Sequence, residues 1–249
     1  MPAIGFPPQE GGWKIAFHTA APSLEPVIRI VREVTMPVTS RPRILIADDH
    51  TLVAEAFKRF LATDFDVIAT VHDGRSLIEV ANALRPDVIL TDIGMPFLNG
   101  LHAAERIKRA LPEVHLIYVT VNHDPEIIAE AFRLGAAAYV LKTSAASELV
   151  KAIHCALQGK RYLSPSLATP APELLTQLDD SQSSYKLTDR QIEVLQLLAE
   201  GRSMKEAAAV LNLTTRTVAF HKYRIMDSLS LNNDAEVVQY AMREHIVFA

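Results

Sequence analysis

The chain has 249 residues, of which 49% are hydrophobic, and its formal net charge is −4. This length and apolar content suffice for one large or two modest domains with buried cores, and the slightly acidic balance excludes binding to nucleic acid through overall charge. The single cysteine excludes an internal disulfide and a cysteine-rich zinc cluster. Because no apolar run approaches the roughly 20 residues of a membrane span, we expect a cytoplasmic protein that does not contact a membrane.

Residues 1–41 are predicted to be an N-terminal extension without ordered structure. They contain several prolines, the only tryptophan and no clean periodicity, and they lack the basic start and apolar core of a secretory signal. Met36 opens the stretch MPVTSRPRILIADDH just before the first predicted strand. Translation starting at Met36 is therefore our hypothesis, and recovery of peptides from residues 1–35 of the native protein would contradict it.

Residues 42–160 alternate between short apolar runs and stretches with helical spacing. The apolar runs RILIA, DVIATV, DVILT, HLIYVT and AYVL are rich in Val, Ile, Leu or Tyr and short enough to be buried parallel strands. Between and after them lie amphipathic segments such as HTLVAEAFKRFLAT and GLHAAERIKRAL. This alternation predicts an α/β domain with a doubly wound, five-stranded parallel sheet covered by helices on both faces.

Residues 161–186 are predicted to be a linker because their composition shifts to Pro, Ser, Thr and Asp. Residues 187–249 then have only helical patterns. Two stretches, starting at Thr188 and Ser203, have the Thr/Ser-x-x-Glu/Gln spacing of a capping box, and Gly201 separates the first helix from the second. The size and spacing predict a small all-α helix-turn-helix domain.

The predicted strands of the first domain end in polar residues that could form one pocket. Asp48 and Asp49 follow the first strand, Asp92 follows the third, Thr120 ends the fourth, and Lys142 follows the fifth. Ligand sites of open parallel sheets lie outside the carboxyl ends of the strands, so we expect these side chains to converge. Lys142 would supply a positive charge and Thr120 a hydroxyl to a bound phosphoryl group.

Asp92 is the predicted nucleophile, which would become an acyl phosphate. Attack on a phosphoryl group requires its charge to be neutralised, and Mg²⁺ held by carboxylates does this. We assign Asp49 as a direct Mg²⁺ ligand, Asp48 as a ligand directly or through water, Asp92 as the third carboxylate, and the backbone carbonyl of Gly94 as a further ligand. Taken singly, each residue would be an ordinary turn, cap or solvated residue; the ordered set favours a phosphorylation site.

The motifs ADDH, VILTDIGMPFLNG, VTVNHD and GAAAYVLK resemble those of bacterial response-regulator receiver domains, from Arg43 to about Ser164. The resemblance implies a flavodoxin-like fold and a cognate histidine kinase that phosphorylates Asp92. It also implies that Thr120 and the aromatic side chain of Tyr139 reorient when the phosphoryl group binds.

The third helix of the second domain has one apolar face, which includes Val218 and Ile225, and three basic residues without an intervening acid. Local positive charge of this kind suits contacts to DNA phosphates, and the residues between could meet base edges. An ordinary solvated helix face is the alternative. The predicted DNA-binding residues are Thr215, Arg216, Thr217, Ala219, Phe220, Lys222, Tyr223 and Arg224.

The segment from about Leu187 to Val247 resembles the LuxR-type DNA-binding domain through LTDRQIEVLQLLAEG, TVAFHKYRIM and NDAEVVQYAMREHIV. The resemblance puts base-facing positions on Ala219, Phe220 and Tyr223. Lysine is frequent in that family where this chain has Ala219, so we expect a different preferred DNA sequence.

The last predicted helix resembles the dimerisation helix of that family. Val237, Val238 and Ala241 would form its apolar seam. Packing of the same side chains onto the domain's own core is an equal alternative.

A receiver followed by this helix-turn-helix resembles the NarL/FixJ subfamily of response regulators. The resemblance implies a transcription regulator rather than an enzyme, which binds DNA and forms a homodimer when Asp92 is phosphorylated. One alternative is a phosphorylation-independent DNA-binding regulator whose receiver is a protein-interaction module. Another is a phosphatase or phosphotransferase with Asp92 as nucleophile, although it would leave the second domain without a role.

Overall fold

The computed structural model describes residues 41–144, 146–167 and 187–248. The N-terminal extension, with the hypothetical start at Met36, and the linker from residue 168 onward lie outside these residues, so the predictions made for them stay predictions. None of the helices in the described ranges is long and apolar enough to cross a membrane.

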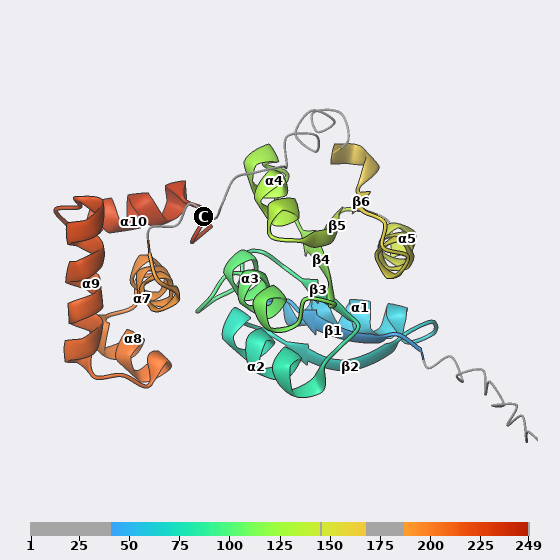
Figure 1. The fold of residues 1–249 in the computed structure, drawn as a ribbon, viewed down its shortest axis with the longest axis horizontal. Helices are drawn as coiled ribbons and strands as arrows, with labels where there is room; N and C mark the ends of the chain where they lie inside the picture. Colours follow the sequence, from blue (N-terminus) through green and yellow to red (C-terminus); the bar gives the residue numbers. More distant parts are fainter. Residues whose placement is uncertain (1–40, 145, 168–186, 249) are drawn as a thin grey trace, which may run out of the picture. The chain divides into compact units, whose positions relative to one another are not determined.

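Strands and helices alternate through the first domain, as the apolar pattern predicts (Figure 1). The strands are β1 (Arg43–Ala47), β2 (Asp66–Val71), β3 (Val88–Thr91), β4 (His115–Thr120), β5 (Ala136–Leu141) and β6 (Tyr162–Leu163). The helices are α1 (Thr51–Leu61), α2 (Gly74–Leu84), α3 (Gly100–Ala110), α4 (Pro125–Arg133) and α5 (Ala146–Leu157), followed by a 3₁₀ turn η1 (Pro165–Leu167). All strand pairs are parallel, in the order β2-β1-β3-β4-β5-β6, so the predicted parallel, doubly wound architecture is confirmed.

The sheet has one strand more than the five predicted. In β6, Tyr162 pairs with Ala138 and Leu163 pairs with Tyr139 of β5. Two residues are too few to show an alternating pattern, and they lie where Pro and Ser predict a linker. The structure therefore joins the first residues of the predicted linker to the edge of the sheet.

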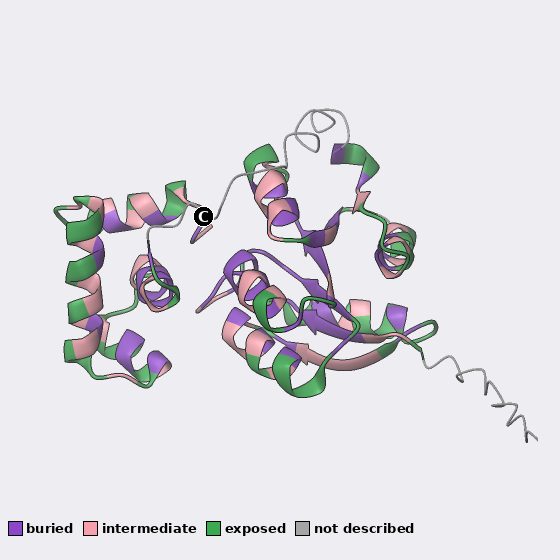
Figure 2. Cartoon of the chain, in the orientation of Figure 1, coloured by how far each residue is buried: buried purple, intermediate pink, exposed green. Residues whose placement is uncertain are grey.

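Side chains alternate between two apolar cores on the two faces of the sheet. Ile44, Ile46 and Ile117 lie on the face covered by α1 and α5, whereas Leu45 and Ile89 lie on the face covered by α2, α3 and α4. Figure 2 shows the central strands in the colour of buried residues and the outer sides of the helices as exposed. Coverage of both faces explains why the strands have continuous apolar runs rather than polar alternation.

The loop between β3 and α3 lies tightly against the end of β3. Asn99 caps α3, since its side-chain oxygen accepts the N–H of His102 at 2.9 Å. Gly100, the first helical residue, donates its N–H to the carbonyl of Ile93 at 2.8 Å. A Cβ at Gly100 would lie only 1.9 Å from the carbonyl oxygen of Asp92, so the loop requires glycine at this position.

The second domain consists of helices packed around one small core. They are α7 (Asp189–Ala199), α8 (Met204–Leu211), α9 (Thr215–Leu229) and α10 (Asp234–Arg243). Thr188 and Ser203 form the two predicted capping boxes, because each cap and the third residue of its helix exchange hydrogen bonds. The buried apolar side chains include Ile192, Leu195, Ala207, Leu211, Val218, Ile225, Val237 and Ala241.

Candidate functional site

The predicted pocket residues meet at the carboxyl edge of the sheet because of the strand register. Ala47 of β1 pairs with Thr91 of β3, and the N–H of Asp92 donates to the carbonyl of Ala47 at 2.9 Å. Asp48 and Asp92 therefore leave adjacent strands at the same level. On the next pair of strands, the N–H of Lys142 donates to the carbonyl of Thr120 at 2.8 Å.

Lys142 bridges the two buried carboxylates. Its Nζ lies 2.6 Å from Oδ2 of Asp92 and 2.8 Å from Oδ2 of Asp48, and these residues are only 6% and 2% exposed. Burial opposes the charge of Lys142, but hydrogen bonds and attraction to Asp48 and Asp92 outweigh it and raise its pKa. The backbone N–H of Ile93 donates to Oδ1 of Asp92 at 2.6 Å, which leaves Oδ2 as the oxygen that faces the ammonium.

Asp48, Asp49, His50 and Asp92 form a candidate cation site. Their ligand atoms all lie within 4.8 Å of one another. The ammonium of Lys142 pairs with only two of the three carboxylates, Asp48 and Asp92, so net negative charge is left over. Carboxylate oxygens are the donors that Mg²⁺ prefers. The residues present therefore fit the predicted cofactor.

His50 is a neighbour that the sequence prediction did not include. Its Nδ1 lies 2.8 Å from Oδ1 of Asp49, and its backbone N–H donates to Oδ1 of Asp48 at 2.9 Å. Its position directly after the two aspartates in ADDH could have indicated that it lies beside the site. Imidazole ranks behind carboxylate as a ligand for Mg²⁺, so His50 fits a role in holding Asp49 better than a role as a ligand.

Gly94 lies in the loop that follows Asp92. Within this loop the N–H of Met95 donates to the carbonyl of Ile93 at 3.0 Å. The loop is therefore ordered by its own hydrogen bonds, and the assignment of the Gly94 carbonyl as a metal ligand stays a prediction.

The predicted switch residues Thr120 and Tyr139 both bind Asn122, in the loop after β4. The backbone N–H of Asn122 donates to Oγ1 of Thr120 at 3.3 Å, and the hydroxyl of Tyr139 donates to the backbone carbonyl of Asn122 at 3.0 Å. Burial, reinforced by the charges of Asp92 and Asp124, raises the pKa of Tyr139 well above its usual value, so its hydroxyl stays protonated. A movement of Thr120 would therefore reach Tyr139 through one shared residue.

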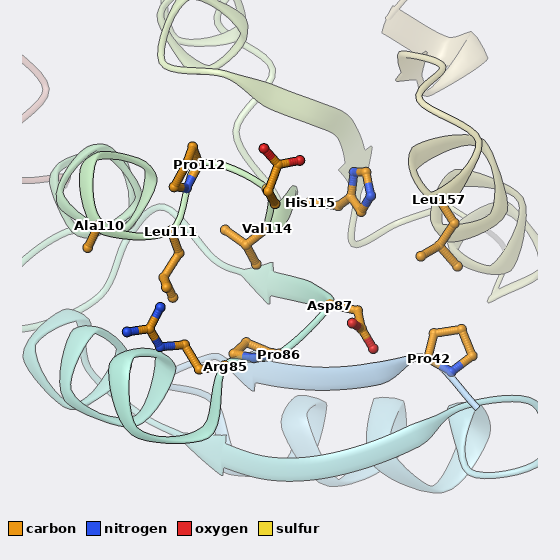
Figure 3. A pocket seen from close by; sticks show the side chains of 11 residues that line it. Pro42, Arg85, Pro86, Asp87, Ala110, Leu111, Pro112, Val114, His115 and Leu157 are labelled. Carbon is orange, nitrogen blue, oxygen red and sulfur yellow. The ribbon is translucent and has the colours of Figure 1, made fainter. Parts of the chain in front are cut away.

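A cavity of about 540 Å³ opens at the opposite edge of the sheet, beside the amino ends of β3 and β4 (Figure 3). Pro86, Leu111 and Val114 line it together with the polar residues Asp87 and His115. Burial lowers the pKa of His115. None of the predicted phosphoryl or metal ligands contributes to the lining, so this cavity is separate from the aspartate pocket.

Helix α9 presents one exposed face that carries most of the predicted DNA contacts. Phe220 and Tyr223 are 58% and 64% exposed, and Arg216 is exposed one turn before Phe220. The guanidinium carbon of Arg224 lies 5.9 Å from the centre of the Phe220 ring, within the range of a cation–π contact. Ala219 is half-buried beside them. These residues form the exposed face of α9.

Three predicted DNA contacts lie elsewhere on α9 or in its first turn. The Nζ of Lys222 lies 2.5 Å from Oδ1 of Asp234 in α10, and the lysine side chain is only 13% exposed. Thr217 donates its N–H to the hydroxyl of Thr214, the N-cap of α9, at 3.1 Å, and Thr215 is exposed in the first turn. The structure therefore does not bring Lys222 to the exposed face of α9.

The three residues predicted for dimerisation differ in their exposure. Val237 and Ala241 are buried in the domain's own core, whereas Val238 is half-buried. Met242, at the end of the same helix, is exposed. The structure thus favours the alternative prediction, packing onto the domain's own core, for two of the three residues.

Comparisons with known proteins match both domains. The family model of the response regulator receiver domain matches residues 44–154, and that of the luxR family of bacterial regulatory proteins matches residues 185–241. Response regulator GacA of Pseudomonas aeruginosa is 30% identical over 83% of this chain and 98% of its own. Oxygen regulatory protein NreC of Staphylococcus epidermidis is 33% identical over 82% and 99%. The structure of an RcsB–DNA complex is similar over 81% of this chain and 98% of that one, with 29% identity and a TM-score of 0.50.

Proposed function

Since the chain belongs to the NarL/FixJ subfamily of two-component response regulators, which bind DNA and regulate transcription, we propose that phosphorylation of Asp92 controls its DNA binding. The observation that carries this proposal is the ion-paired arrangement of Lys142 with Asp48 and Asp92 at the ends of three strands. Such an arrangement offers one nucleophilic oxygen, one cation for the incoming group and carboxylates for a metal.

The phosphoryl donor is a phosphohistidine of a cognate histidine kinase. Oδ2 of Asp92 attacks the phosphorus, the P–N bond breaks, and the new P–O bond makes an acyl phosphate, while the imidazole nitrogen takes back the electron pair. Lys142 then contacts an oxygen of the transferred group. Mg²⁺, when held by Asp48, Asp49, Asp92 and the carbonyl of Gly94, would neutralise charge on the phosphoryl oxygens.

The acyl phosphate adds negative charge and strong acceptor oxygens next to Thr120. The Thr120 hydroxyl turns toward them, which weakens its contact with the N–H of Asn122. The Tyr139 hydroxyl, held by the backbone carbonyl of Asn122, loses that acceptor. Its ring, which is already fully buried, shifts into the space that Thr120 leaves. These changes shift a pre-existing equilibrium from a state in which the DNA-binding domains are masked or unpaired to a dimer.

The exposed face of α9 enters the major groove in this proposal. Phe220 and Tyr223 meet base edges, with Ala219 beside them, and Arg216 and Arg224 contact phosphates. Lys222 supports the helix through its ion pair with Asp234. In the dimer, Val238 and Met242 of α10 contact the second protomer, because Val237 and Ala241 are already buried in the domain's own core.

The phosphorylation site is tested with acetyl phosphate and Mg²⁺ on the full-length protein, by intact mass. Wild-type protein should gain a phosphoryl group, Asp92→Asn should gain none, and EDTA should suppress labelling. Asp64→Asn is the matched control, because Asp64 is an exposed aspartate outside the pocket and its loss should change nothing. Labelling of the Asp92→Asn variant would refute the site assignment.

Control of DNA binding is tested separately, with DNA fragments selected from a random pool by the full-length protein. Phosphorylated wild-type protein should sediment as a dimer and bind these fragments more tightly than either unphosphorylated protein or Asp92→Asn. Equal affinity in all three states would support the phosphorylation-independent alternative. Absence of salt-dependent binding to any fragment would contradict a DNA-binding role.

A further inference from the structure

Ser164, directly after β6, is fully buried and binds three neighbouring segments of the receiver domain. Its N–H donates to the carbonyl of Tyr139 at 3.0 Å. Its hydroxyl accepts the N–H of Leu141 at 3.3 Å, donates to Oε2 of Glu148 at 2.8 Å, and lies 3.1 Å from the hydroxyl of Ser144. We call these five residues the Ser164 clasp.

The clasp holds a segment with few other attachments to the sheet. Strand β6 has only two residues and pairs with β5 alone. Tyr162 packs toward one core and Leu163 toward the other, and Leu167 is buried in the following 3₁₀ turn. The chain then continues through residues 168–186 to the DNA-binding domain. The clasp thus fixes the point at which the interdomain linker begins.

The two backbone groups of β5 that bind Ser164 lie beside the residues that respond to phosphorylation. One is the carbonyl of Tyr139 itself, and the other is the N–H of Leu141, immediately before Lys142. The bond from Leu141 is already long for an N–H···O contact. A small displacement of the end of β5 would therefore break the clasp before it disturbed the longer strands.

We propose that Ser164 is a positioning residue that couples phosphorylation of Asp92 to release of the interdomain linker. This inference rests on the proposed function. When Lys142 follows the phosphoryl group and the buried ring of Tyr139 shifts, the bonds from Ser164 to β5 are lost and β6 leaves the sheet. Two-residue edge pairing opens locally without unfolding the domain, so the linker can move while the receiver core stays intact.

Hydrogen–deuterium exchange of the full-length protein tests this coupling directly. In wild-type protein, Mg²⁺ and acetyl phosphate should make amides in residues 160–167 exchange about fivefold to tenfold faster, as expected for the loss of one or two hydrogen bonds. Ser164→Ala should show this faster exchange without the donor, and the donor should add little. Ser166→Ala, an exposed neighbour in the same turn, is the matched control and should behave as wild type.

A second variant keeps the test sharp if Ser164→Ala folds poorly. Glu148→Ala leaves Ser164 in place and removes its acceptor, so it should raise exchange in residues 160–167 in the same direction. Protein that is labelled on Asp92 yet shows unchanged exchange in this segment would overturn the coupling and leave the proposed function standing. Absence of labelling would overturn the proposed function, and the coupling with it.

Discussion

The aspartate pocket and the exposed face of α9 are built in opposite ways. The pocket collects side chains from separate strands and joins them by ion pairs, as Lys142 does for the buried residues Asp48 and Asp92. The exposed face of α9 comes from one continuous helix, and side chains such as Tyr223 are exposed. In the pocket, the strand register determines where each functional side chain lies. On α9, the position of a charged side chain depends on which neighbouring residue it pairs with.

This difference separates the two regions energetically as well. Buried carboxylates are costly unless they are paired and hydrogen-bonded, so changes in the pocket should alter stability together with chemistry. The exposed side chains of α9 remain in contact with water, so they pay little desolvation free energy on folding. Changes there should alter DNA binding while the free energy of unfolding stays nearly the same.

The largest effect is expected at Gly100, where the pocket depends on backbone packing. In Gly100→Ala the added carbon would lie 1.9 Å from the Asp92 carbonyl oxygen, so the loop must shift. We expect the free energy of unfolding to fall by about 3 kcal/mol, measured by urea denaturation, together with slower labelling by acetyl phosphate. Gly94→Ala is the control for stability alone, since its new carbon meets no described receiver-domain atom within 4 Å. A Gly100→Ala protein as stable as this control would show that the loop is not tightly constrained.

The strand ends of the pocket could be predicted because a parallel sheet leaves few choices. Once Asp92 and Thr120 end apolar runs, the topology brings them to one edge. His50 escaped prediction because its contact with Asp49 depends on a local turn, and β6 escaped because two residues carry no periodicity. Lys222 shows the limit on a helix, since charge pattern alone does not reveal its partner Asp234 in another helix.

A smaller effect is expected when Lys142 is replaced, and it should depend on the metal. In Lys142→Met the buried carboxylates lose the cation that bridges them. Without Mg²⁺, the free energy of unfolding should fall by about 2 kcal/mol, the scale of an unpaired buried charged group. Added Mg²⁺ should restore much of this loss because it supplies positive charge to the same oxygens.

The control for that change is Lys151→Met, which alters an exposed lysine of α5 and leaves the pocket intact. Mg²⁺ should therefore stabilise this control only as much as it stabilises wild-type protein. Thermal unfolding with and without Mg²⁺ measures both variants. If Mg²⁺ stabilises neither Lys142→Met nor Lys151→Met, the three carboxylates do not form one cation site.

The smallest change in stability, with a clear change in binding, is expected on α9. Arg216→Ala should weaken binding to selected DNA about tenfold and lower the salt-dependence slope by about one, as for one lost phosphate contact. Lys222→Met should change that slope little, because its ammonium already pairs with Asp234. Asp234 is 75% exposed, so loss of this pair should cost at most about 1 kcal/mol of stability. Equal slopes for the two variants would mean that Lys222 leaves Asp234 and contacts DNA. The ion pair on α9 would then rearrange on binding, unlike the ion pairs of Lys142 in the aspartate pocket.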